Sequence, residues 1–375
     1  MSAHPPVFAT IADLTTPQTL TALLGISDGP WQLRRAPMSG GLSGATLERL
    51  TLSDGDRYAG AILKRIDPRA NWLMRASGDT ALRELRLTQS PLWEALPNAV
   101  WDPVLGVATE DGVGALLLPD LSPVVYPASL CYDPADDDLV ARILDRIASL
   151  HATLWEHPAL RAQEWLTSPA AAYFALAPDR LSQATYPPTE EDTYGDQATR
   201  MWPFLWKFID GADADPLWHT LARPEALLAA SAGAPATLAH GDTWVANMGG
   251  LTPSAIPTSD PAAERLVLLD WALATAGPAT FDSLWLAQTW RALDPYVVLA
   301  QHRAALLRHG VTTVADDATW ALLADLGWVR TFFMGAEWMV RDVRGATTDE
   351  EDAKARARLN SWSHHTVEIL AERGW

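Results

Sequence analysis

Short runs in which apolar and polar residues alternate fill the first third of the chain. A glycine-rich stretch joins the first two runs, and Ser53-Asp54-Gly55-Asp56 after the second is typical of a hairpin turn. Residues 79–96 instead carry apolar side chains at helical spacing. This part of the chain is therefore predicted to form a small antiparallel sheet with one helix. The predicted strands are 31–38, 45–52, 58–66, 99–108 and 113–118.

Helical spacing dominates the rest of the chain. The pattern changes after Pro119-Asp120-Leu121-Ser122-Pro123, which ends the last predicted strand, and it is helical from about residue 136 onward. The fold class is therefore predicted to be α+β, with a boundary at 119–123. Further long helical segments are predicted around 202–210, 217–230, 282–309, 316–341 and 352–372.

The charge balance narrows the range of partners. The 375-residue chain has 28 Lys and Arg against 46 Asp and Glu, a formal net charge of −18. Such a surface is a poor match for nucleic-acid phosphates or anionic lipids. It suits a cationic substrate, although acidity also serves solubility alone. The single cysteine, Cys131, excludes an internal disulfide and a cysteine-rich zinc site.

Nothing in the sequence predicts a membrane-bound or secreted protein. No apolar run approaches the ~20 residues that a spanning helix needs. The N-terminal stretch MSAHPPVFAT lacks a basic region followed by an apolar one. We therefore expect a soluble, cytoplasmic protein that binds neither nucleic acid nor membrane.

Candidate chemistry is concentrated in two segments of the second part. His240-Gly241-Asp242 and Asn247 follow one short apolar strand, and Asp270-Trp271 follows another at 266–269. Two carboxylates and an amide oxygen at strand ends suit a hard cation such as Mg2+, which takes few protein oxygens. Taken singly, His-Gly-Asp also fits an ordinary turn, and Asp270 fits a helix N-cap or a strand end.

Together, the HGDxxxxN motif, the apolar strand and the Asp-Trp pair resemble the aminoglycoside phosphotransferase and choline kinase-like superfamily, small-molecule kinases of protein-kinase-like fold. The stretch Asp-Thr-Trp-Val-Ala-Asn-Met is most similar to the ecdysteroid-kinase-like branch. The resemblance implies a bilobal fold. A nucleotide-binding lobe at 1–118 would hold a small antiparallel sheet and one helix, and a hinge would follow at 119–123. A larger, mainly helical lobe at 124–375 would bind the acceptor and carry out catalysis.

The resemblance also implies a role for each motif. Asp242 would be the catalytic base, while Asn247 and Asp270 would bind Mg2+. Lys64, held by Glu84, would contact the α- and β-phosphates of ATP. The other ATP-binding residues would be Ile62 against the adenine, Ser39, Gly40, Gly41 and Ser43 in the glycine-rich turn, with either serine facing the phosphates, and Leu118, Asp120 and Leu121 in the hinge.

Supporting roles follow from the same resemblance. His240 would fix the catalytic loop by hydrogen bonds, and Asp282 would hold the loop's backbone. His151 lies on an apolar helical face, where a packing role is expected. Asp270-Trp271-Ala272 replaces Asp-Phe-Gly, and no arginine precedes Asp242. Both departures favour a small-molecule kinase over a protein kinase.

The acceptor site is expected within residues 165–230. An acidic wall there would suit an amino or ammonium alcohol. Alternatively, the carboxylates only solvate loops, and tryptophans such as Trp202, Trp206 and Trp244 hold an uncharged, apolar alcohol. The acidic residues concerned are Glu190, Glu191, Asp192, Asp196, Asp210, Asp213 and Asp215.

The sequence therefore predicts an ATP-dependent phosphotransferase that moves the γ-phosphoryl group of MgATP to a hydroxyl of a small molecule, with a slight preference for a cationic alcohol. Two alternatives stay open. One is a nucleotide-binding scaffold of the same fold without turnover. The other is a metal-dependent hydrolase that uses the same Asp/Asn/Asp cluster.

Overall fold

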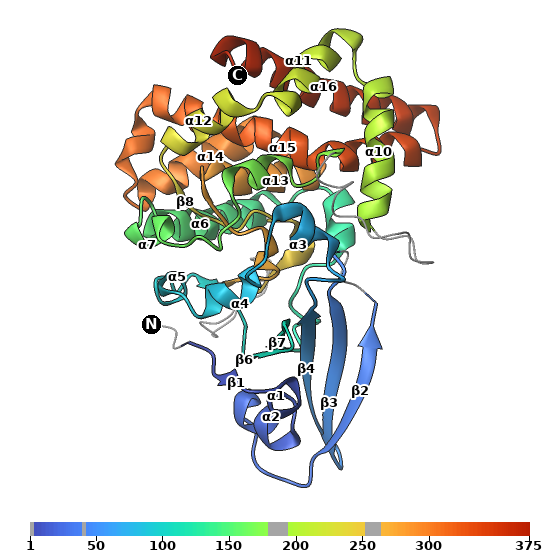
Figure 1. The fold of residues 1–375 in the computed structure, drawn as a ribbon, viewed down its shortest axis with the longest axis vertical. Helices are drawn as coiled ribbons and strands as arrows, with labels where there is room; N and C mark the ends of the chain where they lie inside the picture. Colours follow the sequence, from blue (N-terminus) through green and yellow to red (C-terminus); the bar gives the residue numbers. More distant parts are fainter. Residues whose placement is uncertain (1–3, 40–42, 179–193, 252–263) are drawn as a thin grey trace.

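The structure, a computed structural model, describes residues 4–39, 43–178, 194–251 and 264–375. A twisted sheet with two small helices forms one end of the molecule, and a mass of helices forms the other (Figure 1). The predicted α+β class, with a small, mostly antiparallel sheet and a mainly helical remainder, is confirmed.

The main sheet has six strands in the order β1-β6-β7-β4-β3-β2, and every neighbouring pair is antiparallel except β1 and β6. Because side chains alternate along a strand, Leu116 and Leu117 face opposite sides of the sheet. Leu117 packs with the helices α1 and α2, while Leu116 packs with Leu85 of α4. These elements are β1 (Val7–Phe8), α1 (Ile11–Leu14), α2 (Pro17–Leu24), β2 (Gln32–Met38), β3 (Thr46–Asp54), β4 (Arg57–Ile66), β6 (Gly106–Glu110) and β7 (Val113–Pro119).

Two predicted elements of this part are wrong in their extent. The single helix expected over 79–96 is two short helices, α4 (Arg83–Thr88) and α5 (Pro91–Glu94), preceded by α3 (Trp72–Ser77). Leu82, with φ of 58°, precedes α4, and Pro91 begins α5. The strand expected over 99–108 is also divided: β5 (Val100–Trp101) leaves the main sheet and pairs with β10.

Helices make up most of the second part. Pro295 starts a new helix within the expected segment 282–309, and Pro224 separates two helices within 217–230. No helix in the described residues is long and apolar enough to cross a membrane. The helices are α6 (Asp137–Thr153), α7 (Pro158–Arg161), α8 (Pro169–Phe174), α10 (Tyr194–Phe208), α11 (Gly211–Ala222), α12 (Glu225–Gly233), α13 (Thr280–Thr289), α14 (Pro295–Arg308), α15 (Asp317–Gly345) and α16 (Asp349–Arg373).

Helix α13 lies at the centre of this part and is buried from Thr280 to Gln288. Helix α15 approaches it closely at Gly327, where a Cβ atom would lie 2.5 Å from the Thr280 hydroxyl oxygen. The absence of a side chain at this crossing therefore sets the separation of the two helices.

Two small sheets between the ends of the molecule bring the candidate segments together. One has the order β5-β10-β9, and the other pairs β11 with β8. The amide of Leu269 donates to the carbonyl of Asn247 at 2.9 Å, so Asn247 and Asp270 become neighbours across β9 and β10. The elements are β8 (Thr237–Ala239), β9 (Met248–Gly249), β10 (Leu266–Leu268) and β11 (Thr275–Gly277).

Candidate active site

Two cavities meet at the residues that the motifs single out. The first, of about 330 Å³, lies against the main sheet and is named the sheet-side cavity. The second, of about 180 Å³, lies against α13 and α15 and is named the helix-side cavity. Ser43, Asn247 and Asp270 line both. Any group transferred between ligands of the two cavities would pass these three side chains.

Most of the predicted ATP-binding residues line the sheet-side cavity. Those present are Ser43, Ile62, Lys64, Glu84, Leu118 and Leu121, together with the predicted metal ligands Asn247 and Asp270. Ser39 is exposed and lies outside the cavity, so of the two loop serines only Ser43 is in position. Gly40 and Gly41 fall outside the described residues.

Asp120 does not line the sheet-side cavity. Its amide donates to the carbonyl of Gly60 at 3.0 Å, and its carboxylate accepts the Ser122 hydroxyl at 2.5 Å. Both groups are therefore already used within the protein. The predicted ligand contact at Asp120 is not supported by its position.

Lys64 lies between two carboxylates. Its Nζ is 2.7 Å from Glu84 Oε2 and 3.0 Å from Asp270 Oδ1. Burial disfavours the ammonium, but Asp270 and Glu84 outweigh it and raise the pKa of Lys64. Burial raises the pKa of Glu84 to about 7, despite Lys64. At Asp270 the ammonium outweighs burial and lowers the pKa. Two carboxylates thus share one cation, which leaves an excess of negative charge.

The Asp242 carboxylate is held by a donor on each oxygen. Trp285 Nε1 donates to Oδ1 at 2.8 Å, and Asn247 Nδ2 donates to Oδ2 at 2.9 Å. Burial and the nearby Asp270 charge raise the pKa of Asp242 to about 7, while the Trp285 donor and the Arg330 cation oppose the shift. Asp242 is therefore a fixed carboxylate that takes up a proton more readily than an exposed one.

The backbone leading to Asp242 is fixed by Asp282 of α13. Its two carboxylate oxygens accept the amides of His240 and Gly241, each at 2.8 Å. Gly241 has φ of 83°, and a Cβ atom there would lie 2.3 Å from the Leu273 carbonyl oxygen, so only glycine fits. The predicted contact of Asp282 with the loop's backbone is present.

His240 is a neutral imidazole that ties the loop to the end of β10. Its Nδ1 accepts the Asp242 amide at 3.2 Å, which places the proton on Nε2, and Nε2 donates to the Leu269 carbonyl at 2.9 Å. Burial lowers its pKa, in agreement with a neutral ring. The predicted hydrogen bonds of His240 are therefore present, and neither nitrogen is left for a metal.

His151 lies behind Asp282, away from both cavities. Its Nε2 donates to Asp282 at 3.0 Å, and its Nδ1 faces His302 Nε2 at 3.1 Å. The side chain is fully buried. The expectation of a packing role rather than a catalytic one agrees with this position.

Two residues at the site were not predicted. Trp285 is one turn beyond Asp282 on α13, and this spacing places both on one helix face, a signal that the sequence does contain. Arg330 of α15 is 1 % exposed and donates to the Gly241 carbonyl. Its guanidinium lies 5.5 Å from the centre of the Trp285 ring. No local pattern in the sequence distinguishes Arg330 from other helical arginines.

Apart from Asp242 and Asp270, the walls of the helix-side cavity are largely aromatic and apolar. Its tryptophans are Trp72, Trp244, Trp285 and Trp338, so of the three predicted ones only Trp244 is present. Asp213 is buried against Ser363 at 3.2 Å, and the exposed Asp210 caps α11. Asp210, Asp213 and Asp215 do not line the cavity.

The other acidic residues expected in this wall have no described side chains. Glu190, Glu191 and Asp192 lie outside the described residues, as does the side chain of Asp196. The carboxylates that do line the helix-side cavity are Asp242 and Asp270. The acidic wall expected from Asp210, Asp213 and Asp215 is therefore wrong for this cavity.

The donor atoms fit Mg2+ and a nucleotide. The Asn247 amide nitrogen is bound to Asp242, which leaves its carbonyl oxygen beside Asp270 as a second oxygen donor. The described residues contain no group of three or more His, Cys, Asp and Glu that suits a metal. Mg2+ needs only one or two protein oxygens when phosphates supply the others. The unbalanced carboxylates around Lys64 also favour an added cation.

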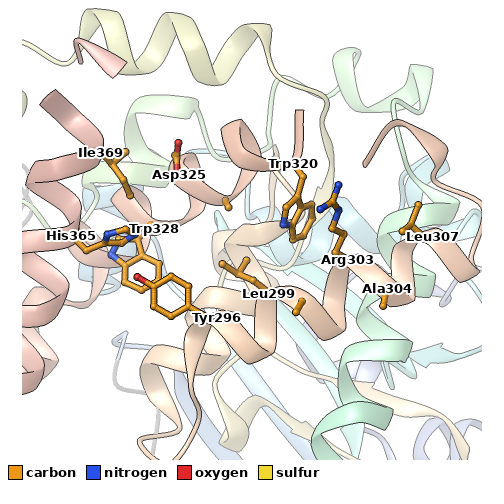
Figure 2. Close-up of a pocket in the computed structure, with 12 residues that line it drawn as sticks. Tyr296, Leu299, Arg303, Ala304, Leu307, Trp320, Asp325, Trp328, His365 and Ile369 are labelled. Carbon is orange, nitrogen blue, oxygen red and sulfur yellow. The ribbon is translucent and has the colours of Figure 1, made fainter. Parts of the chain in front are cut away.

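A further hollow of about 620 Å³ lies between α14, α15 and α16. Figure 2 shows Tyr296, Trp328 and His365 at one end of it and Arg303 beside Trp320 at the other. Arg303 already donates to the Val314 carbonyl and to Asp317. No residue of the HGDxxxxN or Asp-Trp motifs lines this hollow, so it is not the candidate active site.

No protein-family model and no curated protein matches the chain. Solved structures to which it is similar include choline kinase LicA from Streptococcus pneumoniae (11 % identity, 93 % of this chain and 97 % of that chain, TM-score 0.45). Another is an ethanolamine kinase of Plasmodium vivax (10 % identity, 96 % of this chain and 90 % of that chain, TM-score 0.47). A third is a putative aminoglycoside phosphotransferase from Ralstonia eutropha (13 % identity, 92 % of this chain and 94 % of that chain, TM-score 0.39). The resemblance to the superfamily rests on the sequence motifs, and the ecdysteroid-kinase-like branch stays a prediction.

Proposed function

We propose that the protein is an ATP-dependent phosphotransferase that phosphorylates a hydroxyl group of a small molecule. One observation carries the proposal: the cavity that holds Lys64 and the cavity that holds Asp242 meet at Asp270 and Asn247. A nucleotide in the first cavity and an alcohol in the second would face each other across this junction.

ATP would occupy the sheet-side cavity. Ile62 and Leu118 offer apolar surface to the base, and Lys64 offers its ammonium to the phosphates. Pro119 has no N–H, so the hinge donor to the base would be the amide of Leu121. Asn247 and Asp270 would hold Mg2+, which neutralises charge on the phosphates when it is bound.

Asp242 would act as the general base. The acceptor oxygen attacks the γ-phosphorus, the bond from that phosphorus to the bridging oxygen breaks, and ADP leaves. The hydroxyl proton passes to Asp242. A pKa of about 7 suits this role, because a base is most effective near the working pH. Trp285 and Asn247 keep the carboxylate in place during transfer.

The tryptophan walls favour an acceptor with an apolar or flat body. A cationic alcohol is the second candidate, since an ammonium also binds tryptophan faces and is attracted by Asp242 and Asp270. The two differ in salt dependence, because only capture of a charged acceptor weakens as salt screens the carboxylates.

The test is release of ADP from ATP and Mg2+ in the presence of a library of alcohols that contains neutral and cationic members. Acceptor-dependent ADP release is expected. Thermal stabilisation by MgATP without ADP release would instead support the scaffold alternative. Cleavage of phosphate esters without any stabilisation by ATP would support the hydrolase alternative.

A further inference from the structure

The helix-side cavity continues beyond its tryptophan wall. A narrow space of about 20 Å³, named the neck, adjoins it and shares Trp244, Thr289 and Trp338 with it. The Trp244 and Trp338 rings are 5.9 Å apart at their centres and form one side of this passage. Only a slender group would pass between the cavity and the space behind it.

The neck opens into a larger depression of about 1090 Å³, named the outer groove, which shares Arg291, Trp338 and Asp342 with the neck. It runs between the segment that links α13 to α14 and the facing sides of α15 and α16. Trp338 lines all three spaces. The helix-side cavity, the neck and the outer groove therefore adjoin one another between Asp242 and the surface, and this succession is named the route.

Helix α15 sets the length of this route. On α15, Met334 lines the helix-side cavity, Trp338 the neck and Gly345 the outer groove. These residues follow one another at helical spacing along one side of α15. At 1.5 Å per residue, the distance from Met334 to Gly345 is about 16 Å. The route is thus long enough for an extended molecule rather than a compact one.

A residue that lines the neck has a buried polar atom without a partner. Gln288 of α13 lines it and is 3 % exposed, and its Oε1 accepts no hydrogen bond within the described part of the chain. Its Nε2 donates to the Gly335 carbonyl at 3.4 Å. Buried amide oxygens are nearly always bonded, so this one indicates a missing donor. An O–H or N–H group of a ligand in the neck would supply it.

Charges in the outer groove are largely compensated. Arg291 donates to Asp342 at 2.8 Å, and Lys354 donates to Glu350 at 2.6 Å. Arg358 donates to the carbonyl of Ala287 at 3.4 Å. Tyr132 adds an exposed ring above Arg291. Because most of these charges are paired, such a surface offers hydrogen bonds and aromatic faces with little net charge, which suits a neutral polar group better than an ion.

We propose that the acceptor is an elongated alcohol, about 16 Å long, with its reacting hydroxyl at Asp242, a slender middle in the neck and a neutral, hydrogen-bonding end in the outer groove. This inference rests on the proposed function, because it assumes that the helix-side cavity holds the acceptor. It adds the shape and the polarity of the substrate, which the motifs do not define.

Binding of linear α,ω-alkanediols, from lengths that fit the helix-side cavity alone up to about 16 Å, tests the inference. Thermal stabilisation of the protein with MgADP is expected to grow with diol length. Ser361→Trp places a bulky ring in the outer groove at an exposed position of α16. This variant should lose the extra thermal stabilisation that the long diols give, while stabilisation by the short diols stays unchanged. Ala357→Trp, exposed on α16 outside the groove, is the matched control and should behave as wild type.

Turnover separates this inference from the proposed function. With ATP and Mg2+, kcat/KM should rise by about fourfold for each methylene that enters the route. One outcome is binding that grows with diol length and is abolished by Ser361→Trp, but with no ADP release from any diol. That outcome would contradict the proposed phosphotransferase function and still support the inferred shape of the acceptor site. Stabilisation that does not depend on length, or that both tryptophan variants reduce equally, would overturn the inference whether or not short alcohols react.

Discussion

At the scale of single residues, Asp242 is the side chain on which the chemistry depends. Its carboxylate faces the helix-side cavity and is bonded to Trp285 and Asn247. Asp242→Asn keeps the shape but removes the base, so acceptor-dependent ADP release should fall by about 10²–10⁴-fold. Thermal stabilisation by MgATP should stay close to that of wild type. Turnover within tenfold of wild type would disprove the assignment of the base.

Asp270 is expected to bind Mg2+ with the nucleotide, whereas Asp242 acts on the acceptor. Its φ of 65° is better tolerated by asparagine than by other neutral residues, so Asp270→Asn changes the charge with little backbone strain. Because a carboxylate ligand is lost, the extra thermal stabilisation that Mg2+ adds to ATP should largely disappear. Asp120→Asn, outside the cavity, is the control and should retain it. The metal assignment fails if Mg2+ still adds its full stabilisation to the Asp270 variant.

At the scale of elements, the crossing of α13 and α15 supports the site, because α13 carries Asp282 and Trp285 while α15 carries Arg330. Gly327→Ala would push a methyl group into Thr280, so the free energy of unfolding should fall by about 1–3 kcal/mol. Gly345→Ala, on the same helix with nothing within 4 Å, should be neutral or slightly stabilising. Chemical denaturation of the two variants checks this, and equal stability would argue against a tight crossing.

The contact of α14 with α6 should make stability depend on pH. Burial, aided by His151, lowers the pKa of His302 well below its usual value, so the folded protein keeps this ring neutral. Below about pH 6.5 the unfolded chain binds a proton that the folded protein does not, and stability falls. Relative to His302→Gln, wild type should lose about 1 kcal/mol between about pH 6.5 and 5.5. Parallel pH profiles of the two proteins would contradict this.

The elements that the sequence predicts well are those with a local pattern. Alternation of apolar residues places β2, β3 and β4 close to their predicted ranges, and β8 and β10 precede Asp242 and Asp270 as expected. The late start, at Arg83, of the helix expected over 79–96 depends on the positive φ of Leu82, which local propensity disfavours. That conformation is imposed by tertiary packing, which no periodicity records.

The same distinction holds within the candidate site. Lys64, Glu84, Asn247 and Asp270 lie in motifs of fixed spacing, and the structure brings them together. Arg330 comes from a helix far along the chain, and its meeting with Gly241 depends on how α15 packs against α13. The tryptophans of the helix-side cavity likewise come from separate elements. Contacts between distant segments are fixed by packing, so local sequence patterns do not predict them.

At the scale of the whole molecule, the question is what the net charge of −18 does. The exposed Asp210 and Asp215 lie on or next to α11, outside the helix-side cavity, so they act on an acceptor only through a field that salt screens over about 10 Å at 0.1 M. Reversing both to lysine should therefore leave KM for a neutral acceptor unchanged. Asp213 is not a suitable target, because it is buried and bonded to α16.

Trp338→Ala, by contrast, should raise KM for the acceptor. This side chain lines the helix-side cavity and the neck, so its removal takes away aromatic surface on which the acceptor would pack. KM should rise by about tenfold or more, and kcat/KM should change little with added salt. KM measured for both variants at low and high salt decides between the two acceptor classes. If the double reversal raises KM and salt steeply lowers kcat/KM, the surface charge captures a cationic alcohol and the tryptophan walls are secondary. If only Trp338→Ala raises KM, the aromatic walls select the acceptor, and the acidity of the chain plays no part in its recognition.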